Sequence, residues 1–68
     1  MVYERICDAV ADSGLKQKDI AGRIGVSERV LSAMLEGKRK IYADVFFRFC
    51  QVLNKTPDEL YNYKKKAS

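Results

Sequence analysis

Residues 17–36 read QKDIAGRIGVSERVLSAMLE, and their apolar, small and polar positions follow the pattern of two short helices joined by a tight turn. Ile20 and Ile24 lie one turn apart on the first predicted helix, while Leu31 and Met34 lie three residues apart on the second. The apolar residues with the spacing needed to share one core are Ile20, Ile24, Val26, Leu31 and Met34. The segment therefore predicts two helices packed against each other.

The residues at the predicted junction suit a sharp change of direction. Ala21 has the small side chain that lets two helix backbones cross closely. Gly25 can adopt the left-handed conformation that ends a helix, which a residue with a Cβ enters only at a cost. Ser27 can cap the next helix through its hydroxyl. We expect helices over about residues 17–24 and 27–36.

The outward face of the second predicted helix is polar and carries short side chains. Its residues are Ser27, Glu28, Arg29, Ser32, Ala33 and Glu36. No core requires these residues, and together they form a surface suited to lying in a groove of another molecule.

Three further helices are predicted around this pair. The apolar residues Val2, Ile6, Ala9 and Val10 have helical spacing, and Gly14 follows them as a stop. A second apolar stripe consists of Tyr42, Val45, Phe46, Phe49 and Leu53, with Asn54 after it. Thr56-Pro57-Asp58-Glu59 combines an N-cap, a proline at the first helical position and a Glu three residues after the cap. Strand signals are absent, so the predicted fold class is all-α with five helices, the last anchored by Leu60.

The chain of 68 residues is expected to form one domain over residues 1–63, followed by a basic tail at residues 64–68. Thirteen basic and nine acidic residues give a net charge of +4. Between Lys16 and Lys40 there are seven basic and three acidic residues, whereas residues 2–13 carry one Arg and three acids. The cationic side chains are therefore expected on one face, which favours a polyanionic partner.

Several classes of protein are not indicated by the composition. No stretch approaches the roughly 20 apolar residues of a membrane span, and the acidic N-terminal segment is unlike a secretion signal, so we expect a cytoplasmic protein.

Cys7 and Cys50 are far apart and no histidine is present, which argues against a zinc site. We interpret both cysteines as core residues, and the alternative is a disulfide or redox pair. Without histidine or an evident activated nucleophile, an enzyme is not expected. No cofactor or metal is predicted, and no small-molecule ligand is evident from the sequence.

From Leu15 to Leu60 the sequence resembles the lambda-repressor/Cro-like (XRE-type) DNA-binding domains. The resemblance is carried by Leu15, Gln17, Ile20-Ala21, Ile24-Gly25-Val26-Ser27 and Glu36-Gly37-Lys38-Arg39. It implies a compact five-helix bundle in which helices two and three form the helix-turn-helix and the third helix enters the major groove of DNA. Two positions differ from the common pattern: Lys16 replaces a capping Ser or Thr, and Tyr42 stands near the usual Pro-Ser.

Base-reading candidates follow from the outward face of the third helix: Ser27, Glu28, Arg29, Ser32 and Ala33. Arg29 can donate two parallel hydrogen bonds to guanine O6 and N7; the alternative is a phosphate contact or a solvated side chain. Glu28 can accept from cytosine N4, or it can simply complement the helix dipole. Ser32 can bond to several base edges, and Ala33 can pack on a thymine methyl.

Phosphate contacts are predicted near the start of the second helix and after the third: Lys16, Gln17, Lys18, Lys38, Arg39 and Lys40. Lys16, Lys18 and Arg23 are the weaker candidates on the same side. The partial positive charge of a helix N-terminus adds to the attraction at Gln17. The alternative for Lys38 to Lys40 is a solvated basic loop.

A homodimer is expected because one short helix reads only a few base pairs, and two copies read both halves of a palindrome. The resemblance places the dimer contact around the fifth helix, at Val52, Leu60, Tyr61 and Tyr63, with Phe47 able to join. Alternatively, these rings cover the monomer's own core.

The predicted function is sequence-specific binding of double-stranded DNA by a small transcriptional regulator, a repressor that occupies a palindromic operator. The alternative is a protein-interaction module of the same fold, antitoxin-like or antirepressor-like, that uses its aromatic C-terminal residues.

Overall fold

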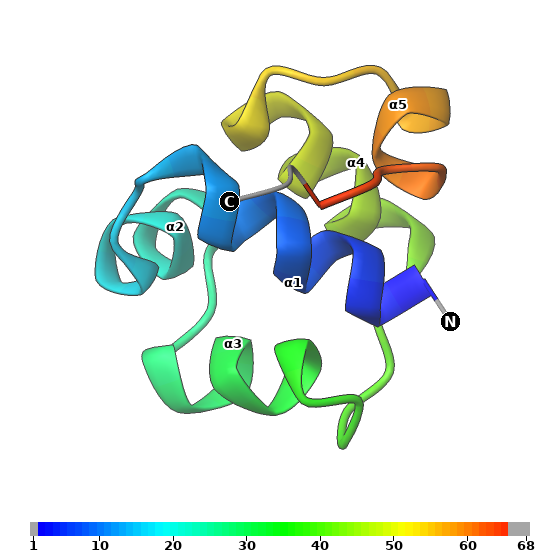
Figure 1. Cartoon of the computed structure of the whole chain (residues 1–68). Helices are drawn as coiled ribbons and strands as arrows, with labels where there is room; N and C mark the ends of the chain where they lie inside the picture. Colours follow the sequence, from blue (N-terminus) through cyan, green and yellow to red (C-terminus); the bar gives the residue numbers. More distant parts are fainter. Residues whose placement is uncertain (1, 66–68) are drawn as a thin grey trace.

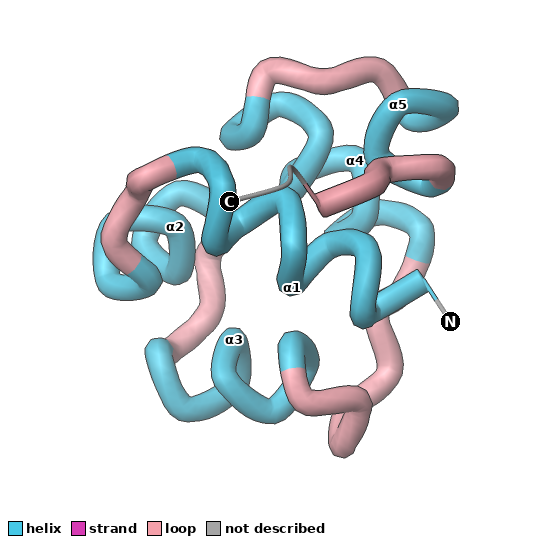
Figure 2. The backbone as a smooth tube through the Cα atoms, in the orientation of Figure 1, coloured by secondary structure: helices cyan, strands magenta, loops and turns pink. Residues whose placement is uncertain are grey.

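Five α-helices follow one another along residues 2–65, the part of the chain that the computed structural model describes, and this part contains no strand (Figures 1 and 2). The helices are α1 (Val2–Ser13), α2 (Gln17–Ile24), α3 (Glu28–Leu35), α4 (Ala43–Leu53) and α5 (Pro57–Tyr61). The all-α, five-helix prediction is confirmed. Lys64 and Lys65 of the predicted tail follow α5 without forming a helix, and residues 66–68 lie outside the described residues.

The helix ends follow the predicted stop and cap residues. Ser27 Oγ accepts a hydrogen bond from the Val30 backbone N–H at 3.2 Å, which caps α3. Thr56 and Glu59 form the reciprocal capping box of α5, with the Thr56 N–H donating to the Glu59 carboxylate at 2.8 Å. Lys16 and Tyr42, the two departures from the family pattern, have extended N-cap backbones but make no side-chain capping bond.

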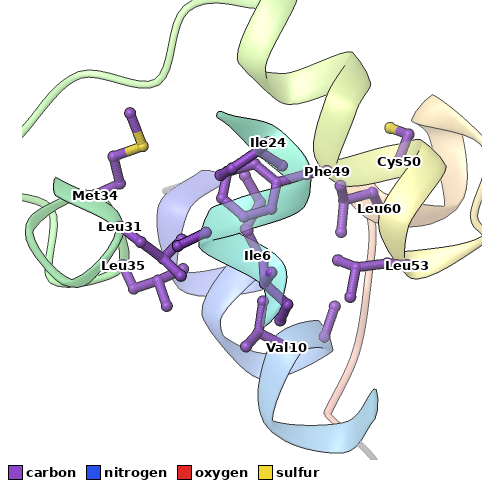
Figure 3. Packing of buried hydrophobic residues seen from close by; sticks show 13 residues of the cluster. Ile6, Val10, Ile24, Leu31, Met34, Leu35, Phe49, Cys50, Leu53 and Leu60 are labelled. Carbon is purple, nitrogen blue, oxygen red and sulfur yellow. The ribbon is translucent and has the colours of Figure 1, made fainter. Parts of the chain in front are cut away.

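One cluster of apolar side chains joins all five helices (Figure 3). Phe49 of α4, a fully buried side chain, lies with Ile24 of α2 at the middle of this cluster. Leu35 of α3 is 6% exposed and belongs to the core, although the sequence analysis did not place it there. Val2, Val26, Val45 and Phe46 are only half-buried and pack around the cluster. The interpretation of the cysteines as core residues agrees with the structure, since Cys50 is buried, Cys7 packs against the cluster, and both thiols are free.

The chain after α5 returns across α1 (Figure 1). The Tyr63 hydroxyl donates a hydrogen bond of 2.6 Å to the Asp12 carboxylate, and Arg5 Nη1 donates to the Tyr63 carbonyl at 3.2 Å. Lys55 Nζ lies 5.0 Å from the centroid of the Tyr63 ring, a distance suited to a cation–π contact. Tyr63 therefore connects the segment after α5 to α1 by two hydrogen bonds.

Tyr63→Phe is expected to reduce the loss of stability at alkaline pH. The hydrogen bond to Asp12, with burial and the charges of Asp12 and Asp8, raises the pKa of Tyr63 to about 12, whereas an unfolded tyrosine titrates near ~10. A group with a raised folded pKa contributes stability below its unfolded pKa and loses it as pH rises through the folded value. Between about pH 10 and about pH 12, the unfolding free energy should thus fall less in Tyr63→Phe than in the wild type. Urea unfolding at a series of pH values measures this difference.

Tyr61→Phe is the matched control, because its ring is exposed. The control should follow the wild type over the same pH range. If Tyr63→Phe also loses stability as steeply as the wild type, the hydrogen bond to Asp12 does not contribute in solution.

Candidate nucleic-acid interface

Helix α3 lies at one end of the molecule with the other four helices on one side of it (Figure 1). Leu31, Met34 and Leu35 face the core. On the other side of the helix, Glu28 and Arg29 are exposed, and Ser32 and Ala33 are half-exposed. The outward face predicted from the sequence is thus open to solvent in the monomer.

The turn between α2 and α3 sets the angle at which α3 is presented. Gly25 has φ +79°, the left-handed conformation predicted for this position. The backbone N–H groups of Gly25 and Val26 both donate to the Ala21 carbonyl, at 2.9 and 3.0 Å. Ala21 is buried, in agreement with the prediction that a small residue is needed where the helices approach. The backbone of this turn is therefore closely specified.

Arg48 is a positioning residue that the sequence analysis missed. Its Nη1 donates a hydrogen bond of 3.1 Å to the Ile24 carbonyl, at the last residue of α2. A cation at this place also complements the partial negative charge of a helix C-terminus. The bond ties α4 to the turn that leads into α3. Because the two residues lie 24 positions apart, no local sequence pattern predicts this contact.

The start of α2 exposes three of the predicted phosphate-binding residues. Lys16 is the N-cap and Gln17 the first helical residue, and both are exposed, as is Lys18. Backbone N–H groups in the first turn of a helix have no partner within the helix, so this end attracts anions.

The loop after α3 exposes three consecutive cations, Lys38, Arg39 and Lys40. Lys38 Nζ lies 3.7 Å from the Glu36 carboxylate, but both side chains are largely exposed and such a pair contributes little. Gly37 begins the loop with φ +78°, and a Cβ at this position would lie 2.5 Å from Cζ of the Tyr3 ring. Tyr3 therefore packs directly on the loop backbone, a contact that the sequence analysis also missed.

The sequence model of the helix-turn-helix family matches residues 10–60 of the chain. The match covers α2, α3 and α4 entirely, together with parts of α1 and α5. The chain belongs to the XRE-type helix-turn-helix family, which is lambda repressor/Cro-like. It is thus a DNA-binding helix-turn-helix regulator. No significant match was found among curated proteins or among solved structures.

In this helix-turn-helix domain, α2 and α3 form the motif, and α3 stands in the place of the recognition helix. Every residue predicted to read bases or to contact phosphates is exposed or half-exposed. Along the chain, the exposed face of α3 lies between the start of α2 and the basic loop. Within residues 2–65, no group of His, Cys, Asp and Glu has the arrangement of a metal site, and no helix could cross a membrane.

The residues predicted for the dimer contact differ in how far they are exposed in the helix-turn-helix domain. Leu60 is 0% exposed and fills the core, so it has no surface to offer a partner and its assignment to the interface is corrected. Tyr61 is 60% exposed. Val52 and Tyr63 are half-buried, and Tyr63 is held by Asp12. The assignments of Val52, Tyr61 and Tyr63 stay predictions.

Proposed function

We propose that this domain recognises specific sequences in double-stranded DNA and acts as a transcriptional repressor, binding a palindromic operator as a homodimer. The supporting observation is the uncovered polar face of α3, where Glu28 and Arg29 are exposed. Along the chain this face is preceded by the exposed Lys16 and Lys18 and followed by the exposed Lys38, Arg39 and Lys40. A recognition helix needs such a face, because its side chains must reach base edges in the major groove.

Arg29 is the proposed centre of base recognition. It is the second residue of α3, and the N-terminal part of a recognition helix approaches the bases most closely. Its guanidinium has a planar pair of donors that matches guanine O6 and N7. Glu28, Ser32 and Ala33 complete the proposed reading face, and Ser27, whose hydroxyl already caps the helix, lies at its edge.

Lys16, Gln17, Lys18, Lys38, Arg39 and Lys40 are the proposed phosphate contacts. Contacts with the phosphate backbone fix the orientation of the protein but carry no sequence information themselves. We therefore assign affinity mainly to these residues and specificity mainly to α3.

Affinity for DNA is expected to fall steeply as salt increases. If about six phosphates are neutralised per bound dimer, the slope of log K against log salt is about −5. Lys40→Gln should reduce the magnitude of this slope by about 1 per protomer. Lys64→Gln, which removes the same charge from the segment after α5, is the control and should leave the slope unchanged. Fluorescence anisotropy titrations at several salt concentrations measure the slope. Equal slopes for Lys40→Gln and wild type would remove Lys40 from the interface.

The surface proposed for the homodimer is an apolar patch centred on Phe47, here called the Phe47 patch. It surrounds a groove of about 320 Å³ and consists of Val2, Ile41, Ala43, Phe46, Phe47 and Tyr61. Phe47 is 52% exposed, and its ring meets Phe46 edge to face at 6.0 Å between centroids. None of these residues is charged, so the patch itself adds no direct charge repulsion between two copies that each carry +4.

Phe47→Ala is expected to shift the equilibrium from dimer toward monomer, because it removes the most exposed phenylalanine of the patch. Analytical ultracentrifugation measures the dimer fraction with and without a palindromic duplex. Leu15→Ala is the control, since Leu15 is exposed in the loop before α2, outside the patch. Dimerisation of Phe47→Ala at wild-type strength would exclude the Phe47 patch as the contact.

Selection of bound duplexes from a random pool is the direct test of the proposed function. We expect enrichment of a motif with two related half-sites about 34–36 Å apart, or a multiple of that spacing. Enrichment of one half-site alone would support DNA recognition by a monomer. Recovery of no preferred sequence would contradict the proposal.

The Phe47 patch also favours a second candidate function, the protein-interaction module. Exposed apolar surface of this kind suits a protein partner as well as a second copy. This function would replace the first if the domain selects no duplex while Arg29→Ala leaves every measured interaction unchanged.

A further inference from the structure

A second groove, here called the Tyr3 groove, lies between the start of α1 and the loop after α3. Its volume is about 550 Å³, which falls within the ~300–1,000 Å³ of small-molecule sites. The residues that line it are Val2, Tyr3, Gly37, Lys38, Arg39, Lys40 and Ile41. Segments more than 30 residues apart in the sequence therefore form a single site, which is open to solvent.

The apolar residues that line the Tyr3 groove, here called its floor, are Val2, Tyr3 and Ile41, and they are less exposed than its charged residues. The Tyr3 ring lies so close to Gly37 that a Cβ there would be 2.5 Å from its Cζ, and the groove depends on this glycine for its shape. Val2 and Ile41 are half-buried and pack against the core. The aromatic ring and the two aliphatic side chains expose apolar surface to water. A ligand that covers this surface with its own apolar part is favoured, because burying apolar surface lowers the free energy.

The charged residues that line the Tyr3 groove, here called its rim, are all cations and are exposed. Lys38, Arg39 and Lys40 line it, and no carboxylate does. The ion pair between Lys38 and Glu36 is 3.7 Å long and exposed, so an anionic ligand can replace it at small cost. Among the described residues, Arg39 and Lys40 have no ion-pair partner. The site therefore lacks the negative charge that its rim would attract.

We infer that the Tyr3 groove binds a small soluble amphiphilic carboxylate, meaning a medium-length aliphatic chain or an aromatic ring that carries one carboxylate. The apolar part covers Tyr3, Val2 and Ile41, and the carboxylate accepts hydrogen bonds from Arg39 and Lys40. A simple anion can pair with the cations of the rim but leaves the apolar floor exposed to water. A neutral apolar molecule covers the floor but leaves the cations of the rim without a counter-charge. Only a ligand with both parts matches both halves of the groove.

Ligand binding would regulate DNA binding, a consequence that rests on the proposed function. Lys38, Arg39 and Lys40 are the proposed phosphate contacts of the loop, and a carboxylate seated among them competes with the DNA backbone for the same cations. The ligand then lowers the apparent affinity for DNA, and DNA lowers the affinity for the ligand by the same factor.

Titration of the whole chain with octanoate, in the absence of DNA and below the concentration at which octanoate forms micelles, tests the site. Nuclear magnetic resonance should show saturable shifts centred on Tyr3 and on residues 37–41. Acetate offers only the charge and octanol only the chain. Each should bind at least about tenfold more weakly than octanoate. Equal effects of acetate, or shifts centred on Phe47 and Tyr61 instead, would overturn the inference.

The double variant Arg39→Gln, Lys40→Gln tests the rim. An exposed ion pair contributes at most about fivefold to affinity, and the double variant removes two cations. We therefore expect octanoate to bind on the order of tenfold more weakly. Lys16→Gln, Lys18→Gln is the matched control, since it removes two exposed charges near the start of α2, and it should bind octanoate as the wild type does. Equal weakening in both double variants would indicate a general charge effect and would contradict a built site.

A final titration separates this inference from the proposed function. Octanoate should weaken binding of the selected duplex by wild type, whereas octanol should not. If the domain binds octanoate at the Tyr3 groove but no duplex, the site stands and the proposed function fails. If it binds the duplex and octanoate causes no shifts, the proposed function stands and the site is refuted.

Discussion

Phe49→Ala is expected to leave a large fraction of the molecules unfolded at 25 °C. Phe49 is 0% exposed and lies at the middle of the only core of the described chain. Truncating a buried phenylalanine to alanine costs about 3–5 kcal/mol. A domain of this length has a total unfolding free energy of about 3–10 kcal/mol. Circular dichroism and urea unfolding should thus show loss of helix, or a transition at much lower urea concentration.

Phe47→Ala is the matched control for this prediction. It makes the same substitution two residues earlier on the same helix, at a side chain that is 52% exposed. At concentrations where the protein is monomeric, its unfolding free energy should fall by less than about 1 kcal/mol. Comparable destabilisation by the two variants would mean that the packing around Phe49 is not as described.

Arg29→Ala is expected to weaken binding to the selected DNA site by about 5–150-fold per half-site, the equivalent of about 1–3 kcal/mol. Arg29 is exposed near the start of α3, where we propose that its guanidinium makes a bidentate contact with guanine. Affinity for an unrelated duplex should fall much less, because that binding depends on phosphate contacts. Anisotropy titrations with both duplexes at one salt concentration measure the difference.

Arg29→Lys distinguishes base recognition from a phosphate contact. Lysine keeps the charge but lacks the planar fork. If Arg29 reads a guanine, Arg29→Lys should lose most of the preference for the selected site. If the lysine variant keeps wild-type discrimination, Arg29 contacts the backbone and the specificity comes from elsewhere.

The positions of the helices were predictable because their signals are local. Each of the first three helices is followed by a glycine with positive φ, and α4 ends at Asn54 with φ 55°. The capping box of α5 could be identified from four consecutive residues. Caps and left-handed stops depend on a few neighbouring residues, and sequence spacing therefore carries them.

The contacts that orient the candidate site were not predictable in this way. Arg48 bonds to Ile24, Tyr3 packs on Gly37, and Tyr63 reaches Asp12 across 51 positions. Each pair depends on how whole helices are packed, and helical periodicity gives the face of a residue but not its partner. The same reason explains Leu60: its position suited both the core and an interface, and only the packing of α5 on the bundle decides between them.

The central claim is that Arg29 reads a guanine in the major groove, and substitution of 7-deazaguanine into the selected duplex tests it most directly. This base lacks the N7 acceptor but pairs normally, so any effect arises from the major groove. We predict that one such substitution per half-site weakens binding of wild type by about 5-fold or more and has no further effect on Arg29→Ala. Equal losses for both proteins at every guanine, or no loss at any guanine, would contradict the account.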